Sequence, residues 1–201
     1  MTNEVPIPHD PLAEMLETLD LSGGETEFVG KSQWMPHGRV FGGQVLAQSL
    51  VAATRTIDNR EVHSMHGYFL RPGDINLPIT FSVDRLRDGR SFSTRRVQAF
   101  QKDEAIFSMI ASFQEHDPGL DHQDEFPTGI PDPESLPSAA DLIGDNPHPV
   151  AQYWSKARPF DMRHVPSPIY FKVEGEPVAH QAVWLRSLGK LPDSQALHTA
   201  A

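Results

Sequence analysis

The chain has 201 residues, no cysteine and a formal net charge of −10. This length allows one substantial domain or two small ones. The lack of cysteine excludes disulfides, thiolate metal sites and a cysteine nucleophile, and the negative charge argues against a general nucleic-acid-binding surface. Because the sequence has no run of 18 apolar residues and no signal region in residues 1–10, we expect a cytoplasmic protein without a membrane partner.

The first predicted elements are a helix over residues 11–21 and a strand over residues 25–33. Asp10 is a plausible cap for this helix, and Pro11 suits its first position. The helix places its apolar residues at helical spacing, at Leu12, Met15, Leu16 and Leu19.

A second helix is predicted over residues 43–54, directly after a pair of glycines. Only Gln48 and Ser49 are polar between Val45 and Ala53, whereas an ordinary surface helix has a polar face. This helix therefore needs to be covered on nearly all sides by other parts of the chain.

Four strands are predicted after this helix, over residues 61–71, 77–86, 91–101 and 105–115. Apolar and polar residues alternate in them, as in Ile79, Phe81 and Val83 against Thr80, Ser82 and Asp84. Short turns join the strands, which predicts an antiparallel sheet. The expected fold class is α+β, with the sheet curled around the apolar helix.

Four motifs in this region closely resemble the N-terminal half of acyl-CoA thioesterase II. They are VFGGQ at residues 40–44, HSMHGYFLRPG at 63–73, RDGRSFSTRR at 87–96 and ASFQ at 111–114. The resemblance implies a double hotdog fold, in which a sheet wraps a central helix twice. It predicts one complete hotdog over residues 1–116 and an incomplete start of a second over residues 158–201.

Residues 117–157 are expected to form a linker with short helices. Seven prolines lie between residues 117 and 149, together with many acidic residues. A short helix is predicted over residues 150–156, and strands over residues 160–165 and 178–186. Residues 194–201 resemble the start of the second central helix.

The resemblance implies hydrolysis of fatty acyl-CoA to a fatty acid and coenzyme A by an activated water, without a covalent intermediate, metal or cofactor. The water-activating residues of the family correspond to positions beyond Ala201. Three alternatives remain open: an inactive acyl-CoA-binding or structural module, a hotdog enoyl-CoA hydratase, or a fragment of a complete enzyme. Because residues 117–201 have too few strands to close a second sheet, we also expect a homo-oligomer.

The turn Gly42-Gly43-Gln44 is the first candidate site. Its free backbone N–H groups at a helix start could stabilise the oxyanion of a thioester; the alternative is that the glycines only permit close packing. Gln44 and Gln48 share a helix face, so their amides point either to a ligand or to strand backbone groups.

Histidines in the 61–71 strand are the second candidate site. In a regular strand His63 and His66 lie on opposite faces, which argues against a shared metal. His66 shares a face with Ser64 and Tyr68, so His66 is a candidate general base and Tyr68 a candidate substrate contact. The alternative is a structural histidine.

Five arginines within twelve residues form the third candidate site: Arg85, Arg87, Arg90, Arg95 and Arg96. Guanidinium groups pair well with phosphate oxygens, and other hotdog proteins resemble the segment Gly89-Arg-Ser91 in using such a turn near the coenzyme. We therefore expect Arg87, Arg90, Ser91 and Arg95 to contact coenzyme A. The alternative is a solvated hairpin with ion pairs to Asp84 and Asp88.

Overall fold

The computed structural model describes residues 5–165, 176 and 179–201. Contacts divide the chain into two compact units. The first, here called the hotdog unit, contains residues 13–118 and 191–201; the second contains the residues up to Leu12 and residues 119–190. The predicted boundaries near residues 116 and 157 stay a prediction, as does the assignment of residues 158–201 to a second hotdog.

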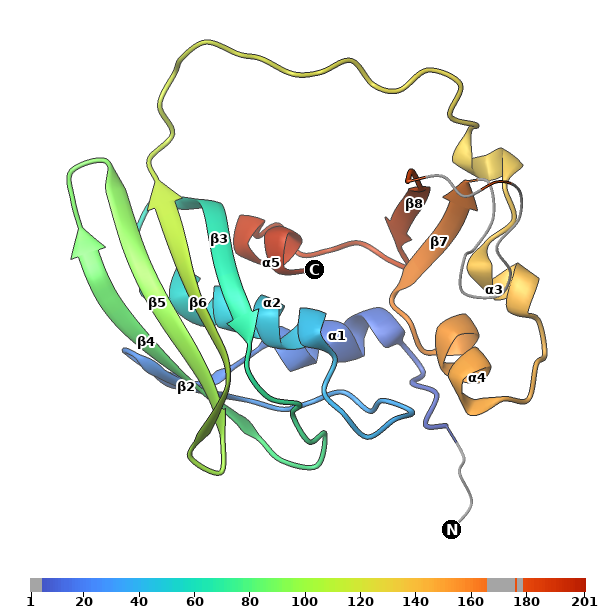
Figure 1. The fold of residues 1–201 in the computed structure, drawn as a ribbon, viewed down its shortest axis with the longest axis horizontal. Helices are drawn as coiled ribbons and strands as arrows, with labels where there is room; N and C mark the ends of the chain where they lie inside the picture. The colour runs from blue at the N-terminus through green and yellow to red at the C-terminus, as the bar shows by residue number, and fades with distance from the viewer. Residues whose placement is uncertain (1–4, 166–175, 177–178) are drawn as a thin grey trace. The chain divides into compact units, whose positions relative to one another are not determined.

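A six-stranded antiparallel sheet forms the frame of the hotdog unit (Figure 1). The strand order is β1-β2-β4-β5-β6-β3, and every pair is antiparallel. The strands are β1 (Ser22–Gly24), β2 (Glu27–Gly30), β3 (Glu61–Phe69), β4 (Ile79–Asp88), β5 (Phe92–Gln101) and β6 (Glu104–Gln114). The register sets Phe81 opposite Ala99, and Ala99 opposite Phe107, so one face presents a continuous apolar layer.

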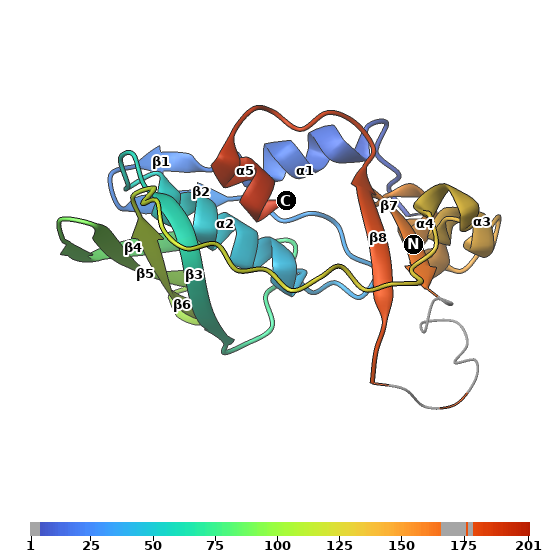
Figure 2. The ribbon, with the colours of Figure 1, turned by 90° about the horizontal axis from the view of Figure 1, so that it is seen from above.

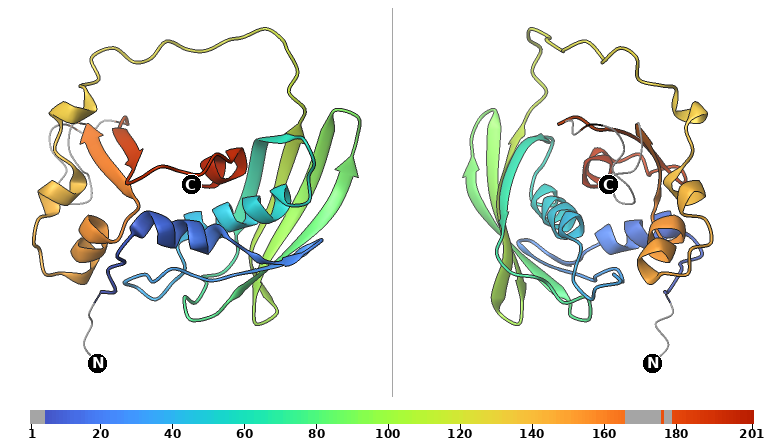
Figure 3. Two further views of the ribbon diagram at one scale, coloured as in Figure 1. Left: turned by 180° about the vertical axis from the view of Figure 1, so that it is seen from behind. Right: turned by 45° about the vertical axis from the view of Figure 1, so that its right-hand side comes forward.

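Helix α2 (Gly42–Thr54) lies against this apolar layer, inside the curve of the sheet (Figure 3). Its residues Ala52 and Ala53 are fully buried, and Leu50 is 1% exposed. Helix α1 (Pro11–Leu19) adds Leu19 to the same core, and α5 (Gln195–Ala200) lies beside α2 (Figure 2). The predicted wrapped helix and the α+β hotdog fold are therefore confirmed.

Two irregularities were not predicted from the alternation of residues. The expected strand over residues 25–33 is shorter and extends from Glu27 to Gly30. It begins later because Glu25 has a φ of 56° in the turn between β1 and β2. In β3 the register with β6 shifts between Val62 and Ser64, which is a β-bulge at His63. This bulge changes the side on which His63 lies.

The described residues of the second unit form a two-stranded antiparallel sheet and three short helical segments. These are β7 (Phe160–Val165), β8 (Ala182–Ser187), η1 (Pro133–Ser135), α3 (Ala139–Ile143) and α4 (Pro149–Lys156). Arg163 donates from Nη1 to the carbonyl of Pro133 at 2.7 Å, which holds the η1 segment against β7. The strand predicted over residues 178–186 begins at Ala182; its first residue, Val178, lies outside the described residues.

Among the helices in the described part of the chain, none combines the length and the hydropathy that a membrane span requires.

Candidate functional site

The predicted site residues fall into three places in the hotdog unit: the start of α2, the outer face of the sheet, and the turn between β4 and β5. The first and last of these lie at opposite ends of α2. Because α2 has 13 residues, about 20 Å separates its two ends.

The start of α2 carries unpaired backbone donors. The first helical N–H groups with partners are those of Gln44 and Val45, which both donate to the carbonyl of Phe41, at 3.1 and 3.3 Å. Within the described residues, the N–H groups of Gly42 and Gly43 make no hydrogen bond, and Phe41 provides no side-chain cap. Free donors at the positive end of a helix dipole favour a negatively charged or polar acceptor.

A cavity of about 350 Å³ lies at this helix start. Its walls are Val40, Gly42, Val45, Phe69, Leu70, Arg71, Pro72, Gly73 and Ile106. Arg71 is the one ionisable residue among them. This volume falls in the range of small-molecule sites, and apolar walls suit a hydrocarbon chain.

The two glycines also permit close packing, as the structural alternative predicted. A Cβ on Gly42 would lie 3.0 Å from Cζ of Phe69, and one on Gly43 would lie 2.4 Å from Cε1 of Phe41. The aromatic rings therefore approach the helix start at distances that larger residues would prevent. Close packing and a set of free donors coexist at this position.

Gln44 and Gln48 make hydrogen bonds within the protein, which favours the structural alternative, and their contact with substrate stays a prediction. Gln44 donates to Gln48 Oε1 at 3.1 Å and to the carbonyl of Lys31 at 3.1 Å. Gln48 donates to the carbonyls of Thr18 at 2.8 Å and Lys31 at 2.9 Å. All four amide N–H bonds of the pair are thus engaged, and Gln48 is fully buried.

His66 and Tyr68 lie on the outer face of the sheet, away from α2. They pair with Ile110 and Ser108 of β6, which alternate with the buried residues of that strand. The ring centroids of His66 and Tyr68 are 4.9 Å apart, and neither residue lines the cavity at the start of α2. The geometry therefore gives no support to His66 as a general base or to Tyr68 as a contact at that cavity.

The expectation that His63 lies on the opposite face from His66 is wrong. The β-bulge turns His63 outward, where its Nε2 is 2.8 Å from Oγ of Ser112. Ser112 shares the outer face with Ile110, the partner of His66. No group of three potential metal ligands is found in the described part of the chain.

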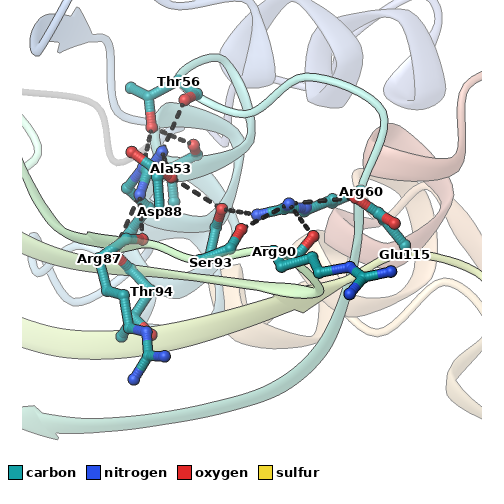
Figure 4. Close-up of polar contacts among 11 residues, drawn as sticks. Ala53, Thr56, Arg60, Arg87, Asp88, Arg90, Ser93, Thr94 and Glu115 are labelled. Atoms are coloured by element: carbon teal, nitrogen blue, oxygen red, sulfur yellow. Dashed lines mark hydrogen bonds and ion pairs between the residues drawn. The ribbon is translucent and has the colours of Figure 1, made fainter.

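Arg95 is buried, with its side chain 3% exposed, which argues against its predicted contact with coenzyme A. Its Nε and Nη2 donate to the hydroxyl and carbonyl of Thr56, at 2.7 and 3.1 Å. Its Nη1 donates to the carbonyls of Arg87 and Thr94, and Nη2 also donates to Asp88 Oδ1 at 2.7 Å (Figure 4). A guanidinium has five N–H donors, so none remains for a phosphate.

The acidic residues around the β4–β5 turn are each paired with an arginine from outside its tip residues. Asp88 pairs with Arg95, Asp84 pairs with Arg96 at 2.7 Å, and Glu115 pairs with Arg60 at 3.1 Å. Three exposed arginines then have no ion pair with a described residue: Arg85, Arg87 and Arg90. The ion pairs with Asp84 and Asp88 expected by one alternative are present, and the contact of this hairpin with coenzyme A stays a prediction.

Arg60 fixes the tip of the turn and was missed by the sequence analysis. Its Nη2 donates to the carbonyls of Gly89 and Arg90, each at 2.8 Å, and its Nη1 donates to Ser93 Oγ (Figure 4). Arg60 precedes β3, so no spacing within residues 84–96 indicates it. Ser91 is exposed at the tip, with its carbonyl accepting from the N–H of Glu115.

Asp88 is charged at neutral pH. The Ser93 hydroxyl donates to its carboxylate at 2.7 Å and the Arg95 guanidinium does the same, and these bonds lower the pKa of Asp88 below its usual range. The negative charge beside the tip is therefore permanent near neutral pH, and its position depends on these two donors.

Replacement of Gln48 by Leu should lower the free energy of unfolding by about 1–3 kcal/mol, because it leaves buried carbonyls without donors. Affinity for coenzyme A esters should stay within twofold. Denaturant unfolding and a ligand titration measure the two effects. Gln98→Leu is a matched control on the outer face of β5, since the Gln98 side chain is only partly buried there. Weaker ligand binding by Gln48→Leu at unchanged stability would contradict the structural role.

The matching family model is described as "Acyl-CoA thioesterase N-terminal domain" and covers residues 31–114. Human acyl-coenzyme A thioesterase 8 is 38% identical over 187 residues, which is 87% of this chain and 56% of the human protein. Acyl-CoA thioesterase 2 of Haemophilus influenzae is 37% identical over 174 residues, 82% of this chain and 59% of that protein. The chain thus spans less than two thirds of these relatives.

Solved structures agree with this assignment. The tesB protein of Mycobacterium avium subsp. paratuberculosis superposes with a TM-score of 0.75 at 34% identity, covering 95% of this chain and 67% of that protein. Acyl-CoA thioesterase II TesB2 of Mycobacterium marinum superposes with a TM-score of 0.69 at 38% identity, covering 93% and 64%. On these similarities, together with its wrapped central helix, the chain belongs to the acyl-CoA thioesterase II family.

Proposed function

We propose that the protein hydrolyses fatty acyl-CoA to a free fatty acid and coenzyme A. The observation that carries this proposal is the apolar cavity beside the unpaired N–H groups of Gly42 and Gly43. The acyl chain occupies the cavity, and the thioester carbonyl accepts from these donors. When water attacks the carbonyl carbon, the oxygen gains negative charge, which the donors and the helix dipole stabilise. The C–S bond then breaks, and the coenzyme A thiolate leaves and takes up a proton.

The described residues at the cavity supply no general base for this water. Arg71 is the ionisable residue in its walls, and a guanidinium stays protonated in proteins. The family resemblance assigns water activation to residues beyond Ala201. This division of roles is part of the proposal: the hotdog unit binds the acyl chain and polarises the carbonyl, and another segment activates the water.

The turn between β4 and β5, with Arg85, Arg87 and Arg90, is here called the cationic turn. It is proposed to hold the nucleotide end of coenzyme A. Arg85, Arg87 and Arg90 are exposed and have no ion pair with a described residue, and coenzyme A carries a diphosphate and a ribose phosphate. Bidentate guanidinium–phosphate pairs suit this chemistry. The net charge of −10 makes such a local excess of cations significant.

An acyl-CoA-binding module without hydrolytic activity is the second candidate function. The absence of a general base among the cavity walls favours it. An enoyl-CoA hydratase also needs a general acid or base, so the same observation counts against that alternative. A thioesterase and a non-hydrolytic acyl-CoA-binding module would use the same cavity and the same cationic turn. Release of free thiol distinguishes the two.

Self-association is proposed on the basis of β3. It is an edge strand of the sheet, and six of its nine residues are exposed, which leaves its outer hydrogen-bonding groups available to another strand. Within one hotdog unit, the cavity and the cationic turn lie at opposite ends of α2. In a dimer, the cationic turn of one copy could lie near the cavity of the other. Light scattering tests the oligomeric state. The cytoplasmic location stays a prediction that cell fractionation would test.

Leu70→Asp should weaken binding of a non-hydrolysable decanoyl-CoA analogue at least tenfold, because it places a charge in the apolar wall of the cavity. Affinity for coenzyme A without an acyl chain should stay within about twofold. Isothermal titration with both ligands measures the difference. Leu120→Asp is the matched control, since Leu120 is fully exposed and far from the cavity walls in sequence. Equal losses for both ligands would place the acyl chain elsewhere.

Release of free thiol from decanoyl-CoA tests hydrolysis itself. We expect the 201-residue chain to bind the substrate but to release little thiol, and a longer natural form, if one exists, to release it rapidly. Turnover by the 201-residue chain at the rate of an intact relative would show that a residue present here activates the water.

Arg90→Ala should weaken coenzyme A binding, and the loss should shrink as salt rises, since exposed charges are screened over about 8–10 Å near physiological ionic strength. Arg96→Ala is the matched control, because Arg96 is already paired with Asp84 on the outer face. Titrations at low and high salt measure both variants. Equal losses in the two variants would indicate a general charge effect rather than a site.

A further inference from the structure

Asp88 is the acidic residue closest in sequence to the cationic tip, and the structure holds it back from that tip. It is the last residue of β4, directly before Gly89. Its side chain is 56% exposed, so solvent leaves it room to turn. Its Oδ1 nevertheless accepts from Arg95 Nη2 and from Ser93 Oγ, each at 2.7 Å.

Arg95 is in turn fixed by a rigid frame. Three of its five donors contact Thr56 and Arg87, which belong to the end of the α2 segment and to β4. Only the arginine of the Arg95–Asp88 pair is buried, because the Asp88 side chain is 56% exposed. An ion pair with one exposed partner contributes little to stability, so the fixed position of Asp88 is the more informative feature of this pair.

The ion pairs of the hairpin keep its acidic residues apart from the arginines at the tip. The hairpin segment contains two acidic residues, and both are paired with arginines that lie off the tip: Asp84 with Arg96, and Asp88 with Arg95. The positive charges of Arg87 and Arg90 at the tip therefore have no ion pair with a described residue. Arg87 even lies across the turn, with its Nε 3.1 Å from where a Cβ on Gly89 would be. In Figure 4 the guanidinium groups of Arg87 and Arg90 have no dashed contact.

We propose that Arg95 is a positioning residue for ligand binding: it sequesters the Asp88 carboxylate so that Arg87 and Arg90 stay free for the phosphates of a coenzyme A ester. This inference rests on the proposed function of the turn. Without Arg95, Asp88 is free to pair with Arg87 or Arg90 and competes with the phosphates. Arg95 itself touches no ligand.

Charge-changing variants test this proposal. Arg95→Gln releases Asp88 and should weaken coenzyme A binding about three- to tenfold at low salt, the effect of one unit charge within several ångströms at a partly exposed site. Arg95→Gln combined with Asp88→Asn removes both charges and should restore affinity to within about twofold. Arg95→Lys keeps the charge and should bind normally although it loses hydrogen bonds and melts at a lower temperature.

The measurement is isothermal titration of each variant with coenzyme A at low and high salt, together with a thermal melt. Arg96→Gln is the control, since it removes one charge from a pair on the outer face. If the double variant stays as weak as Arg95→Gln, Arg95 acts only as a brace and the proposal fails. If Arg95→Gln does not fold, Asp88→Asn decides: an affinity within twofold of the wild type supports sequestration, and a gain above threefold overturns it.

A separate pair of variants tests whether the cationic turn binds coenzyme A at all. If Arg87→Ala combined with Arg90→Ala leaves coenzyme A affinity unchanged at low salt, the nucleotide does not bind at the turn. If that double variant weakens binding while Arg95→Gln does not, the turn binds the nucleotide and only the role of Arg95 is refuted.

Discussion

A helix buried on nearly every side is the constraint on which the hotdog unit depends. Helix α2 has no polar face, so the sheet must curve around it, and each polar group near it needs an internal partner. Gln44 and Gln48 satisfy carbonyls beside its first half, and Arg95 satisfies the carbonyl of Thr56 just after its end. These polar contacts fix the segments around both ends of the helix, where the cavity and the cationic turn lie.

Local charge pairing creates the second feature of the site. In a protein of net charge −10, an anionic ligand requires a local excess of cations. The β4–β5 turn has such an excess, because Asp84, Asp88 and Glu115 each have an arginine partner. Arg60 also occupies the tip carbonyls of Gly89 and Arg90 as acceptors.

Alternating residues predicted the strands, because burial on one face imposes that period directly. The short turns predicted the antiparallel pairing, and the nearly all-apolar helix predicted that the sheet wraps it. Arg95 faces inward with Val97 and Ala99 in the structure, a position that the same alternation could have indicated; the sequence analysis instead grouped Arg95 with the other arginines of the cluster. The sequence of β3 does not indicate the bulge at His63, because the position of an extra residue depends on how β3 pairs with β6. The acceptors of Gln44 and Gln48 likewise come from segments distant in sequence, so spacing could not identify them.

In the proposed complex, coenzyme A and its acyl chain contact opposite ends of α2. Amide chemical shifts of the ¹⁵N-labelled chain test this most directly. Titration with coenzyme A alone should perturb the N–H signals of residues 87–91 and leave those of Gly42 and Gly43 unchanged. A non-hydrolysable acyl-CoA should perturb the glycine signals as well. Shifts confined to the outer face of β3, or to the second unit, with both ligands would contradict the proposed site.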